Sequence, residues 1–270
     1  MKLSLAYSPC PNDTFIFDAM VHHKVDTEGL DFEVQLHDVE ALNKMALNHD
    51  IDVTKLSFNA FLNVYKEYAL LSSGSALGEK CGPLLIVKQN KLDSFNAQSL
   101  VAIPGKYTTA NSLFSLVYPN NTNTKELLFS EIEEAVLNGD VDAGVIIHEN
   151  RFTYQDKGLV KIMDLGEYWE EQTQLPIPLG GIVASKRLDV SVQKKIQRVL
   201  KRSVEFAFQN PEESQDYVKQ HAQEMDVEVM NSHIQLYVNA YSLDLGEKGR
   251  QSVRYLFERK GIPTTNLDII

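Results

Sequence analysis

Two kinds of hydrophobic pattern alternate along the first hundred residues. Short alternating or continuous apolar runs predict strands, and apolar residues spaced three and four apart predict helices. The predicted segments are a strand at 2–7, a helix at 15–23, a strand at 32–39, a helix at 40–48 and a strand at 51–57. Asn12, Asp13 and Thr14 are candidate N-caps of the first helix. Strand–helix–strand repeats are typical of βαβ units with a mainly parallel sheet.

A second set of the same elements follows, and the chain then becomes helical. The predicted segments are a strand at 100–105, a helix at 108–118, a helix, turn and strand within 130–149, and a strand at 159–166. Residues 182–188 alternate like a strand that returns to the first set. The remaining residues have a helical pattern, and Pro211 suits the first turn of a new helix.

A short internal repeat suggests two related halves. Residues 47–53 (LNHDIDV) and 137–143 (LNGDVDA) share a leucine, an asparagine and two aspartates at the same positions. In each copy a predicted helix ends and an acidic turn leads into a predicted strand. The alternative interpretation is coincidence, since turns between helices and strands draw on few residue types.

These patterns together predict an α/β protein with the two-lobed fold of type II periplasmic-binding proteins and a ligand cleft between the lobes. The first lobe would comprise residues 1–88 and 184–270, and the second residues 89–183. Two crossing segments make a hinge, and hinged lobes of this kind close on small molecules.

Charge and composition exclude several classes of partner. The chain has 270 residues and a net charge of −11, which argues against a nucleic-acid or anionic membrane surface. Cys10 and Cys81 lie far apart and outside any metal-ligand spacing, so we expect reduced thiols. The apolar run before Ser8 is too short for a signal peptide, and no run approaches a membrane span. We therefore expect a cytoplasmic protein, and its oligomeric state stays open.

Among the seven histidines, His148 has the position of a catalytic base. It follows the apolar run 143–147, and the carboxyl ends of parallel strands line the ligand crevice of such sheets. Imidazole titrates near neutral pH, which suits proton transfer. The alternative is a structural histidine at a strand end. His37 lies in a predicted strand, and the others are expected mostly on the surface: His22, His23, His49, His221 and His233.

Two further segments have the residues of a binding site. Lys55 and Ser57 lie on the same side of a predicted strand, where an ammonium and a hydroxyl suit a carboxylate or a polyhydroxylated ligand. Thr109 and the N–H of Ala110 lie at a predicted helix N-terminus, which favours anions. A surface lysine beside a capping serine, and ordinary helix capping, are the respective alternatives. The turn at 8–13 should face the same crevice as Lys55.

Motifs for other chemistries are missing from the sequence. There is no GxxxxGK[ST] or GxGxxG, so we expect no phosphate cradle of those types. There is no HExxH, and the histidines lack metal-ligand spacing, so we expect no metal.

Eight segments together resemble the 1,4-dihydroxy-6-naphthoate synthase family of the futalosine route to menaquinone. They are SPCPNDTF (8–15), TKLS (54–57), GPLL (82–85), PGKYTTA (104–110), HENRFTY (148–154), DLGEYWEE (164–171), LPIPLGG (175–181) and YVNAYSLDLG (237–246). The resemblance runs over the whole chain in order, and the combination is more specific than any single segment.

The resemblance implies a cytoplasmic lyase that converts cyclic dehypoxanthine futalosine to 1,4-dihydroxy-6-naphthoate without a cofactor. It gives His148 the role of proton acceptor, and it places Lys55, Leu56, Ser57, Thr109 and Ala110 at the substrate. Three alternatives share the fold: a solute-binding protein, the sensor domain of a transcription regulator, and chorismate dehydratase of the same pathway. The HENRFTY and TKLS segments favour the synthase over the dehydratase.

Overall fold

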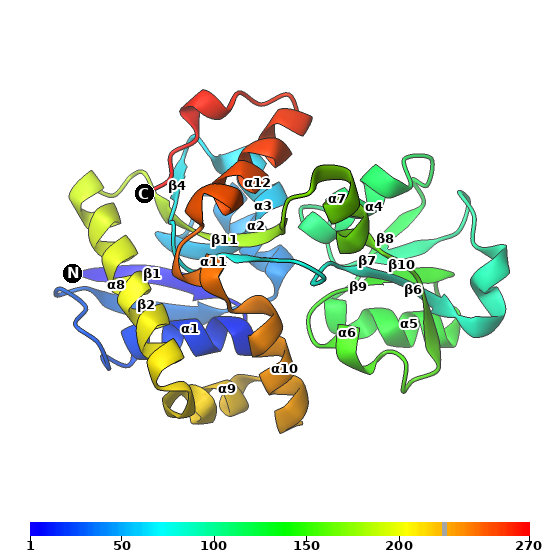
Figure 1. The fold of residues 1–270 in the computed structure, drawn as a ribbon, viewed down its shortest axis with the longest axis horizontal. Helices are drawn as coiled ribbons and strands as arrows, with labels where there is room; N and C mark the ends of the chain where they lie inside the picture. Colours follow the sequence, from blue (N-terminus) through cyan, green and yellow to red (C-terminus); the bar gives the residue numbers. More distant parts are fainter. Residues whose placement is uncertain (223–225) are drawn as a thin grey trace. The chain divides into compact units, whose positions relative to one another are not determined.

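The computed structural model describes residues 1–222 and 226–270, and these residues form two compact units (Figure 1). Unit 1 comprises Met1–Gly78 and Pro178–Ile270, and unit 2 comprises Glu79–Ile177. Each unit has one sheet with helices packed against it, so the predicted α/β class is confirmed.

The sheet of unit 1 has the strand order β2-β1-β3-β11-β4, with β5 paired to β11. Its strands are β1 (Lys2–Tyr7), β2 (Asp31–Leu36), β3 (Val53–Ser57), β4 (Tyr68–Leu70), β5 (Ala76–Gly78) and β11 (Ile177–Ser185). Strand β1 is parallel to β2 and β3, whereas β11 is antiparallel to β3 and β4. The parallel centre fits the predicted βαβ units.

Helices cover both faces of this sheet (Figure 1). They are α1 (Pro11–Val21), α2 (Val39–Leu47), α3 (Phe58–Val64), α8 (Val190–Gln209), η3 (Pro211–Ser214), α9 (Gln215–His221), α10 (Val227–Tyr237), α11 (Ala240–Leu243), α12 (Gly246–Arg259) and η4 (Thr264–Asn266). Leu3 and Leu5 of β1 pack with Phe17 of α1 and Val199 of α8 in the main core. On α3 and α12, Phe61 and Phe257 meet edge to face at 5.6 Å.

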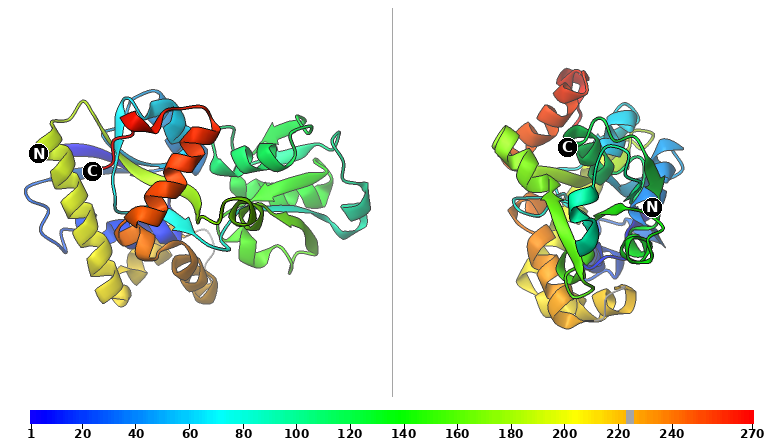
Figure 2. Two further views of the ribbon diagram at one scale, coloured as in Figure 1. Left: turned by 45° about the horizontal axis from the view of Figure 1, so that its top comes forward. Right: turned by 90° about the vertical axis from the view of Figure 1, so that its right-hand side faces the viewer.

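The C-terminal residues pair with the sheet of unit 1 (Figures 1 and 2). Ile269 forms a parallel bridge with Leu70, and the N–H of Ile270 donates to the carbonyl of Leu70 at 2.9 Å. The N–H of Ser72 donates in turn to the carbonyl of Ile270. These bonds satisfy backbone groups at the edge strand β4, which would otherwise be exposed.

The sheet of unit 2 has the order β10-β6-β9-β7-β8. Its strands are β6 (Leu84–Lys88), β7 (Val101–Ile103), β8 (Thr124–Glu126), β9 (Ala143–Ile146) and β10 (Leu159–Asp164). Its helices are η1 (Gln89–Ser94), α4 (Thr109–Val117), η2 (Phe129–Glu131), α5 (Ile132–Asn138), α6 (Asn150–Thr153) and α7 (Leu165–Thr173). Ile132 and Val136 of α5 pack on Ile86 and Ala102 of the sheet.

The unit boundaries differ from the predicted residues 88/89 and 183/184. Strand β6 pairs with β9 and β10, so the first crossing falls before it, after Gly78. Strand β11 pairs with β3 from Gly180 onward, so the second crossing also falls earlier, after Ile177.

The two sheets share one topology, which explains the internal repeat. Read from the opposite edge, the second sheet is β8-β7-β9-β6-β10, in which β7 is parallel to β8 and β9, and β6 is antiparallel to β9 and β10. Strands β1, β2, β3, β11 and β4 have these same relations in unit 1. The repeated residues thus lead into equivalent strands, β3 and β9.

The repeated turns also have equivalent hydrogen bonds. His49 and Asp50 donate to the carbonyls of Ala46 and Met45, and Gly139 and Asp140 donate to those of Val136 and Ala135. This is the paired pattern of a Schellman turn, which requires a left-handed residue after the helix. His49 has φ 60° and Gly139 has φ 82°, so both meet that requirement.

No helix within residues 1–222 and 226–270 has both the length and the apolar character needed to cross a membrane.

Candidate functional site

In unit 1, the predicted residues lie at the carboxyl ends of two parallel strands. Strand β1 leads into the turn at Ser8–Cys10 and then α1, and its neighbour β3 ends with Lys55, Leu56 and Ser57. Because parallel neighbours end at the same edge of a sheet, the turn and these three residues come together.

Lys55 forms a buried ion pair with Asp13 of α1. Its Nζ lies 3.0 Å from Asp13 Oδ1, and it also donates to the carbonyl of Gly74 at 3.0 Å. The two side chains are only 9% and 3% exposed. The surface-lysine interpretation is therefore wrong, because a buried ammonium needs acceptors that offset its lost hydration.

Helix α1 begins earlier than predicted, so its polar residues Asn12 and Asp13 lie in the first turn of the helix and do not cap it. Cys10 is the N-cap, without a side-chain cap hydrogen bond, and Pro11 occupies the first turn. Proline suits that position because its missing N–H is not needed there and its φ is already helical. Asn12 and Asp13 are therefore not the N-caps we predicted. Asn12 Nδ2 instead donates to Asp13 Oδ1 at 2.8 Å.

Ser57 is held by Asn43 of α2. Its backbone N–H donates to Asn43 Oδ1 at 2.9 Å, and its Oγ accepts from Asn43 Nδ2 at 3.3 Å. Ser57 is the N-cap residue of α3, but its hydroxyl does not cap the helix. Asn43 also donates to Glu40, so three polar groups are joined beneath the end of β3. Leu56, between the two polar residues, is buried.

Unit 2 places Thr109, Ala110 and His148 at one sheet edge in the same way. Strands β7 and β9 are parallel neighbours, and they lead into α4 and His148 respectively. Thr108 is the N-cap, and its Oγ1 accepts from the N–H of Asn111 at 3.1 Å. Thr109 and Ala110 are then the first helical residues, whose N–H groups have no acceptor within the helix.

His148 has a strained backbone two residues after β9. Its φ is 58°, in the left-handed region that costs a residue with a side chain about 1–3 kcal/mol. Its ring meets Phe129 of η2 edge to face, with centroids 4.8 Å apart. Strain of this kind persists only where neighbouring contacts hold it, and such positions cluster at functional sites.

The residues after His148 supply one of those contacts on the side of α5. Asn150 Nδ2 donates to the buried Glu133 Oε2 at 2.6 Å, and Lys157 Nζ lies at the same distance from this oxygen. Asn150 begins the short helix α6. Phe129 and Glu133, one helical turn apart, therefore hold the ring of His148 and the helix that follows it.

Arg151 anchors the same segment through a second set of contacts. Its guanidinium donates to the carbonyls of Gly82 and Lys80, at 2.5 and 2.9 Å, and to Asp164 Oδ2 at 2.6 Å. Asp164 Oδ1 in turn caps α7 by accepting from Gly166 and Glu167.

The chain at Gly82 leaves no space for a side chain. A Cβ atom there would lie 2.2 Å from the Cα of Gly166, so both positions need glycine for the backbones to approach. Burial also raises the pKa of the neighbouring Cys81 thiol to about 12. Neither Cys10 nor Cys81 forms a disulfide within the described residues, which agrees with the expected thiols.

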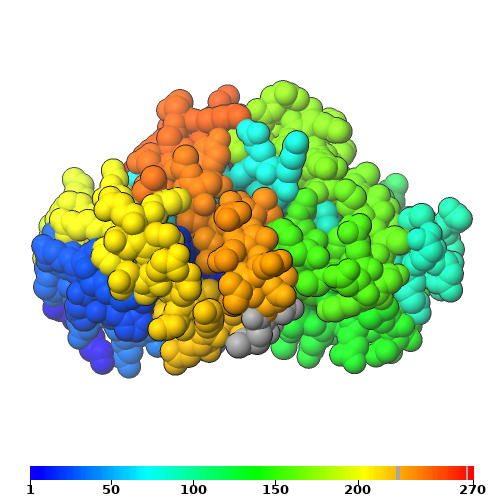
Figure 3. Space-filling model, turned by 60° about the horizontal axis from the view of Figure 1, so that its bottom comes forward, coloured from blue at the N-terminus to red at the C-terminus, as the bar shows by residue number. Residues whose placement is uncertain are grey.

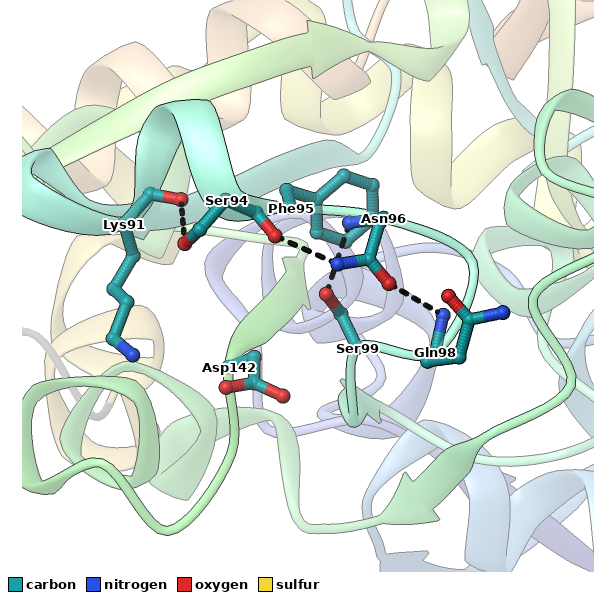
Figure 4. A pocket seen from close by; sticks show the side chains of 7 residues that line it. All are labelled: Lys91, Ser94, Phe95, Asn96, Gln98, Ser99 and Asp142. Carbon is teal, nitrogen blue, oxygen red and sulfur yellow. Dashed lines mark hydrogen bonds between the residues drawn. The ribbon is translucent and has the colours of Figure 1, made fainter.

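Two surface hollows lie apart from these residues. One, of about 260 Å³, lies between α9 and α10, whose surfaces adjoin in Figure 3, with Val218, Met230 and Ile234 in its lining. The other, of about 220 Å³, is formed in unit 2 by Ser94, Asn96 and neighbouring residues (Figure 4). Polar groups there bond to one another, as expected of a folded turn: Ser94 to Lys91, Asn96 to Ser94 and Ser99, and Gln98 to Asn96.

Sequence reasoning missed the supporting residues of both edges. Asn43, Glu133 and Gly74 lie outside every segment singled out in the sequence, and Asp164 begins the segment DLGEYWEE but was given no role there, because the partners of all four are distant in sequence. His233 was expected on the surface, and this is wrong: it is fully buried, with Nε2 2.9 Å from Asn12 Oδ1. Its place on the inner face of α10, three residues after the buried Met230, was the available signal.

Comparisons with known proteins agree with the resemblance. A family model described as "Menaquinone biosynthesis" matches residues 3–261. A 1,4-dihydroxy-6-naphthoate synthase from Thermus thermophilus is 46% identical over 255 residues, 94% of this chain and 92% of that protein. One from Streptomyces coelicolor is 43% identical over 262 residues, 95% of this chain and 92% of that protein.

Solved structures show the fold. A crystal structure of a protein from Archaeoglobus fulgidus has a TM-score of 0.89 and 35% identity, covering 96% of this chain and 98% of that one. The periplasmic aliphatic sulphonate binding protein of Escherichia coli has a TM-score of 0.66 at 12% identity, covering 99% and 95%. The predicted periplasmic-binding-protein-like fold is therefore confirmed. The ligand cleft that the sequence predicts stays a prediction.

Proposed function

The chain belongs to the menaquinone biosynthesis family, and from this premise we propose that it is a 1,4-dihydroxy-6-naphthoate synthase. Its substrate is cyclic dehypoxanthine futalosine, and the enzyme acts in the cytoplasm as a carbon–carbon lyase. The observation that carries the proposal is the 43–46% identity to two synthases over nearly the whole chain.

His148 acts as the general base in this proposal. The substrate must lose a proton before its carbon skeleton rearranges into an aromatic ring, and a base of near-neutral pKa suits that step. The contacts of Phe129, Asn150 and Arg151 support the assignment, because they fix the residue in a conformation that it would not adopt by itself. A base that is already held in its reactive orientation loses little further rotational freedom when the transition state forms.

The proposal assigns substrate-binding donors within each unit. In unit 2, the hydroxyl of Thr109 and the N–H of Ala110 bind the carboxylate at the positive end of α4. In unit 1, Lys55 and Ser57 bind oxygens of the sugar-derived part. Two N–H groups of the Lys55 ammonium have acceptors among the described residues, and an ammonium has three. The third donor is assigned to the substrate.

Turnover by the purified protein tests the proposal. We expect incubation with cyclic dehypoxanthine futalosine to give 1,4-dihydroxy-6-naphthoate, detected by its mass. Chorismate serves as the matched substrate, because the dehydratase alternative would consume it. Dehydration of chorismate, or binding of the futalosine without product, would replace the proposal by one of the alternatives with the same fold.

A further inference from the structure

We propose that His233 is a positioning residue that acts on Lys55 through Asn12 and Asp13. The proposal rests on the function above, because it assigns a role in that substrate site to α10. His233 lies 221 residues from Asn12 in sequence, and none of the roles described so far uses it.

The four side chains form a continuous buried chain within unit 1. His233 Nε2 lies 2.9 Å from Asn12 Oδ1, Asn12 Nδ2 lies 2.8 Å from Asp13 Oδ1, and that oxygen lies 3.0 Å from Lys55 Nζ. His233 is fully buried, and each of the other three is less than a tenth exposed. A buried network of this kind has few alternative arrangements once every member is bonded.

The direction of each hydrogen bond follows from the carboxylate. Asp13 accepts at Oδ1 from Asn12 and Lys55, and at Oδ2 from the hydroxyl and N–H of Ser8. Because Asn12 donates with Nδ2, its oxygen faces His233 and must accept. His233 therefore donates with Nε2, and it fixes which way the amide of Asn12 points.

This direction matters for the orientation of the Lys55 ammonium. Asp13 Oδ1 and the carbonyl of Gly74 each hold one of its N–H groups, and together they set where the third points. Without the donor of His233, the oxygen of Asn12 loses its partner and the amide is free to turn. Asp13 would then lose the donor from Asn12, and the ammonium would lose its fixed partner.

The test compares two substitutions of His233 in the full chain. His233→Leu removes the donor, whereas His233→Gln keeps an N–H near the position of Nε2. We expect His233→Leu to raise KM for cyclic dehypoxanthine futalosine about tenfold, the loss expected from an unsatisfied buried group, with kcat within about threefold. We expect His233→Gln to restore KM to within about twofold of the wild type.

A matched control and a double variant separate positioning from folding. Met230→Leu alters the same buried face of α10 without a hydrogen bond, and it should leave KM and kcat unchanged. Asn12→Ala should raise KM as His233→Leu does, and the double variant should be no worse than Asn12→Ala alone, because both interrupt one chain. An additive double variant, an unchanged KM in His233→Leu, or failure of His233→Gln to restore KM would overturn the proposal.

Crystal structures of His233→Gln and Asn12→Ala test the same proposal without measuring activity. They also do not require that His233→Leu folds. The distance between Lys55 Nζ and Asp13 Oδ1, 3.0 Å here, should be kept in His233→Gln and lost in Asn12→Ala. If the wild type makes no naphthoate, the proposed function fails, while this distance still decides whether His233, Asn12 and Asp13 position Lys55. If the wild type is active and the distance is unchanged in Asn12→Ala, only the positioning role fails.

Discussion

The two units have the same sheet topology but different chemistry at the ends of equivalent strands. Strand β3 of unit 1 ends in Lys55 and Ser57, whose side chains are fixed by buried ionic and amide contacts. Strand β9 of unit 2 leads into His148, whose position depends on a strained backbone anchored by neighbouring side chains. On the proposed function, the comparison teaches that equivalent strands of a repeated framework can end in binding groups in one copy and in a general base in the other.

Removing the imidazole of His148 tests the reactive side of this comparison, and it has the largest expected effect. We expect His148→Ala and His148→Asn to lower kcat about 10²–10⁴-fold, the usual contribution of a general base. Asparagine tolerates left-handed backbone better than most residues, so it separates the loss of the base from a change of the loop.

Steady-state kinetics and product binding by calorimetry measure the two contributions of His148. Product affinity should stay within about threefold of the wild type if the base acts in the chemical step. A His148→Asn variant with near-wild-type kcat would move the reactive group elsewhere.

Removing single hydroxyls tests the binding side in each unit. We expect Ser57→Ala and Thr109→Ala to raise KM about three- to tenfold with little change in kcat, because each removes one neutral hydrogen bond. Thr108→Ala is the matched control in α4. It should lower the free energy of unfolding by about 1 kcal/mol through loss of the cap, with KM unchanged.

Kinetics and urea unfolding of these three variants together sharpen the comparison. Unchanged KM in both Ser57→Ala and Thr109→Ala would remove the hydroxyls from the substrate site. A raised KM in Thr108→Ala would show that the helix cap at Thr108 also contributes to substrate binding.

The equivalent turns offer a smaller test of the shared framework. Gly139→Ala should destabilise the protein by about 1–2 kcal/mol, because φ is 82° and a Cβ there meets no atom closer than 3.4 Å, so only the backbone resists. His49→Gly should instead raise the free energy of unfolding, and by a smaller amount. The substitution relieves the left-handed strain, but a more flexible unfolded chain partly offsets this gain. Urea unfolding measures both changes in the free energy of unfolding. If the two substitutions changed it in the same direction, the two turns would not be energetically equivalent.

A pH-dependent contact confined to unit 1 gives the smallest effect. Hydrogen bonds from Arg198, and then from Arg202, lower the pKa of Glu28 to about 2 from its ordinary 4.5. The ionised form is favoured in the folded protein, so its contribution is complete above pH 4.5 and lost as the pH falls through 2. Glu28→Gln should therefore be less stable than the wild type at pH 6.

Urea unfolding from pH 6 downward checks this contact. The difference between wild type and Glu28→Gln should shrink below pH 4.5, and a difference that is independent of pH would contradict the pKa shift.

Local patterns predicted the elements well and the supporting contacts poorly. The strand predicted at 2–7 is β1, and the helix predicted at 40–48 lies within one residue of α2, because alternation and capping are local signals. The start of α1 was wrong because Asn12 and Asp13 resemble N-caps, although Pro11 already marks the first turn. Strands β4, β5 and β8, of three residues each, were not predicted, whereas β7, of the same length, was predicted at 100–105.

The candidate site was predictable only in its residues at strand and helix ends. The structure places Lys55 and Ser57 at one sheet edge and Thr109 and His148 at another, as parallel strands require. Their partners come from tertiary contacts, such as Asn12 with His233, which no spacing along the chain encodes. Buried polar residues on amphipathic helices were the one signal left unused.

The Schellman turns after α2 and α5 define two segments that could be exchanged by protein engineering. Both turns close with the same two backbone hydrogen bonds and lead into equivalent strands, so we expect an exchange of residues 45–53 with residues 135–143 to keep these hydrogen bonds. A chimaera carrying the glycine-containing version in both places would inherit the less strained junction twice.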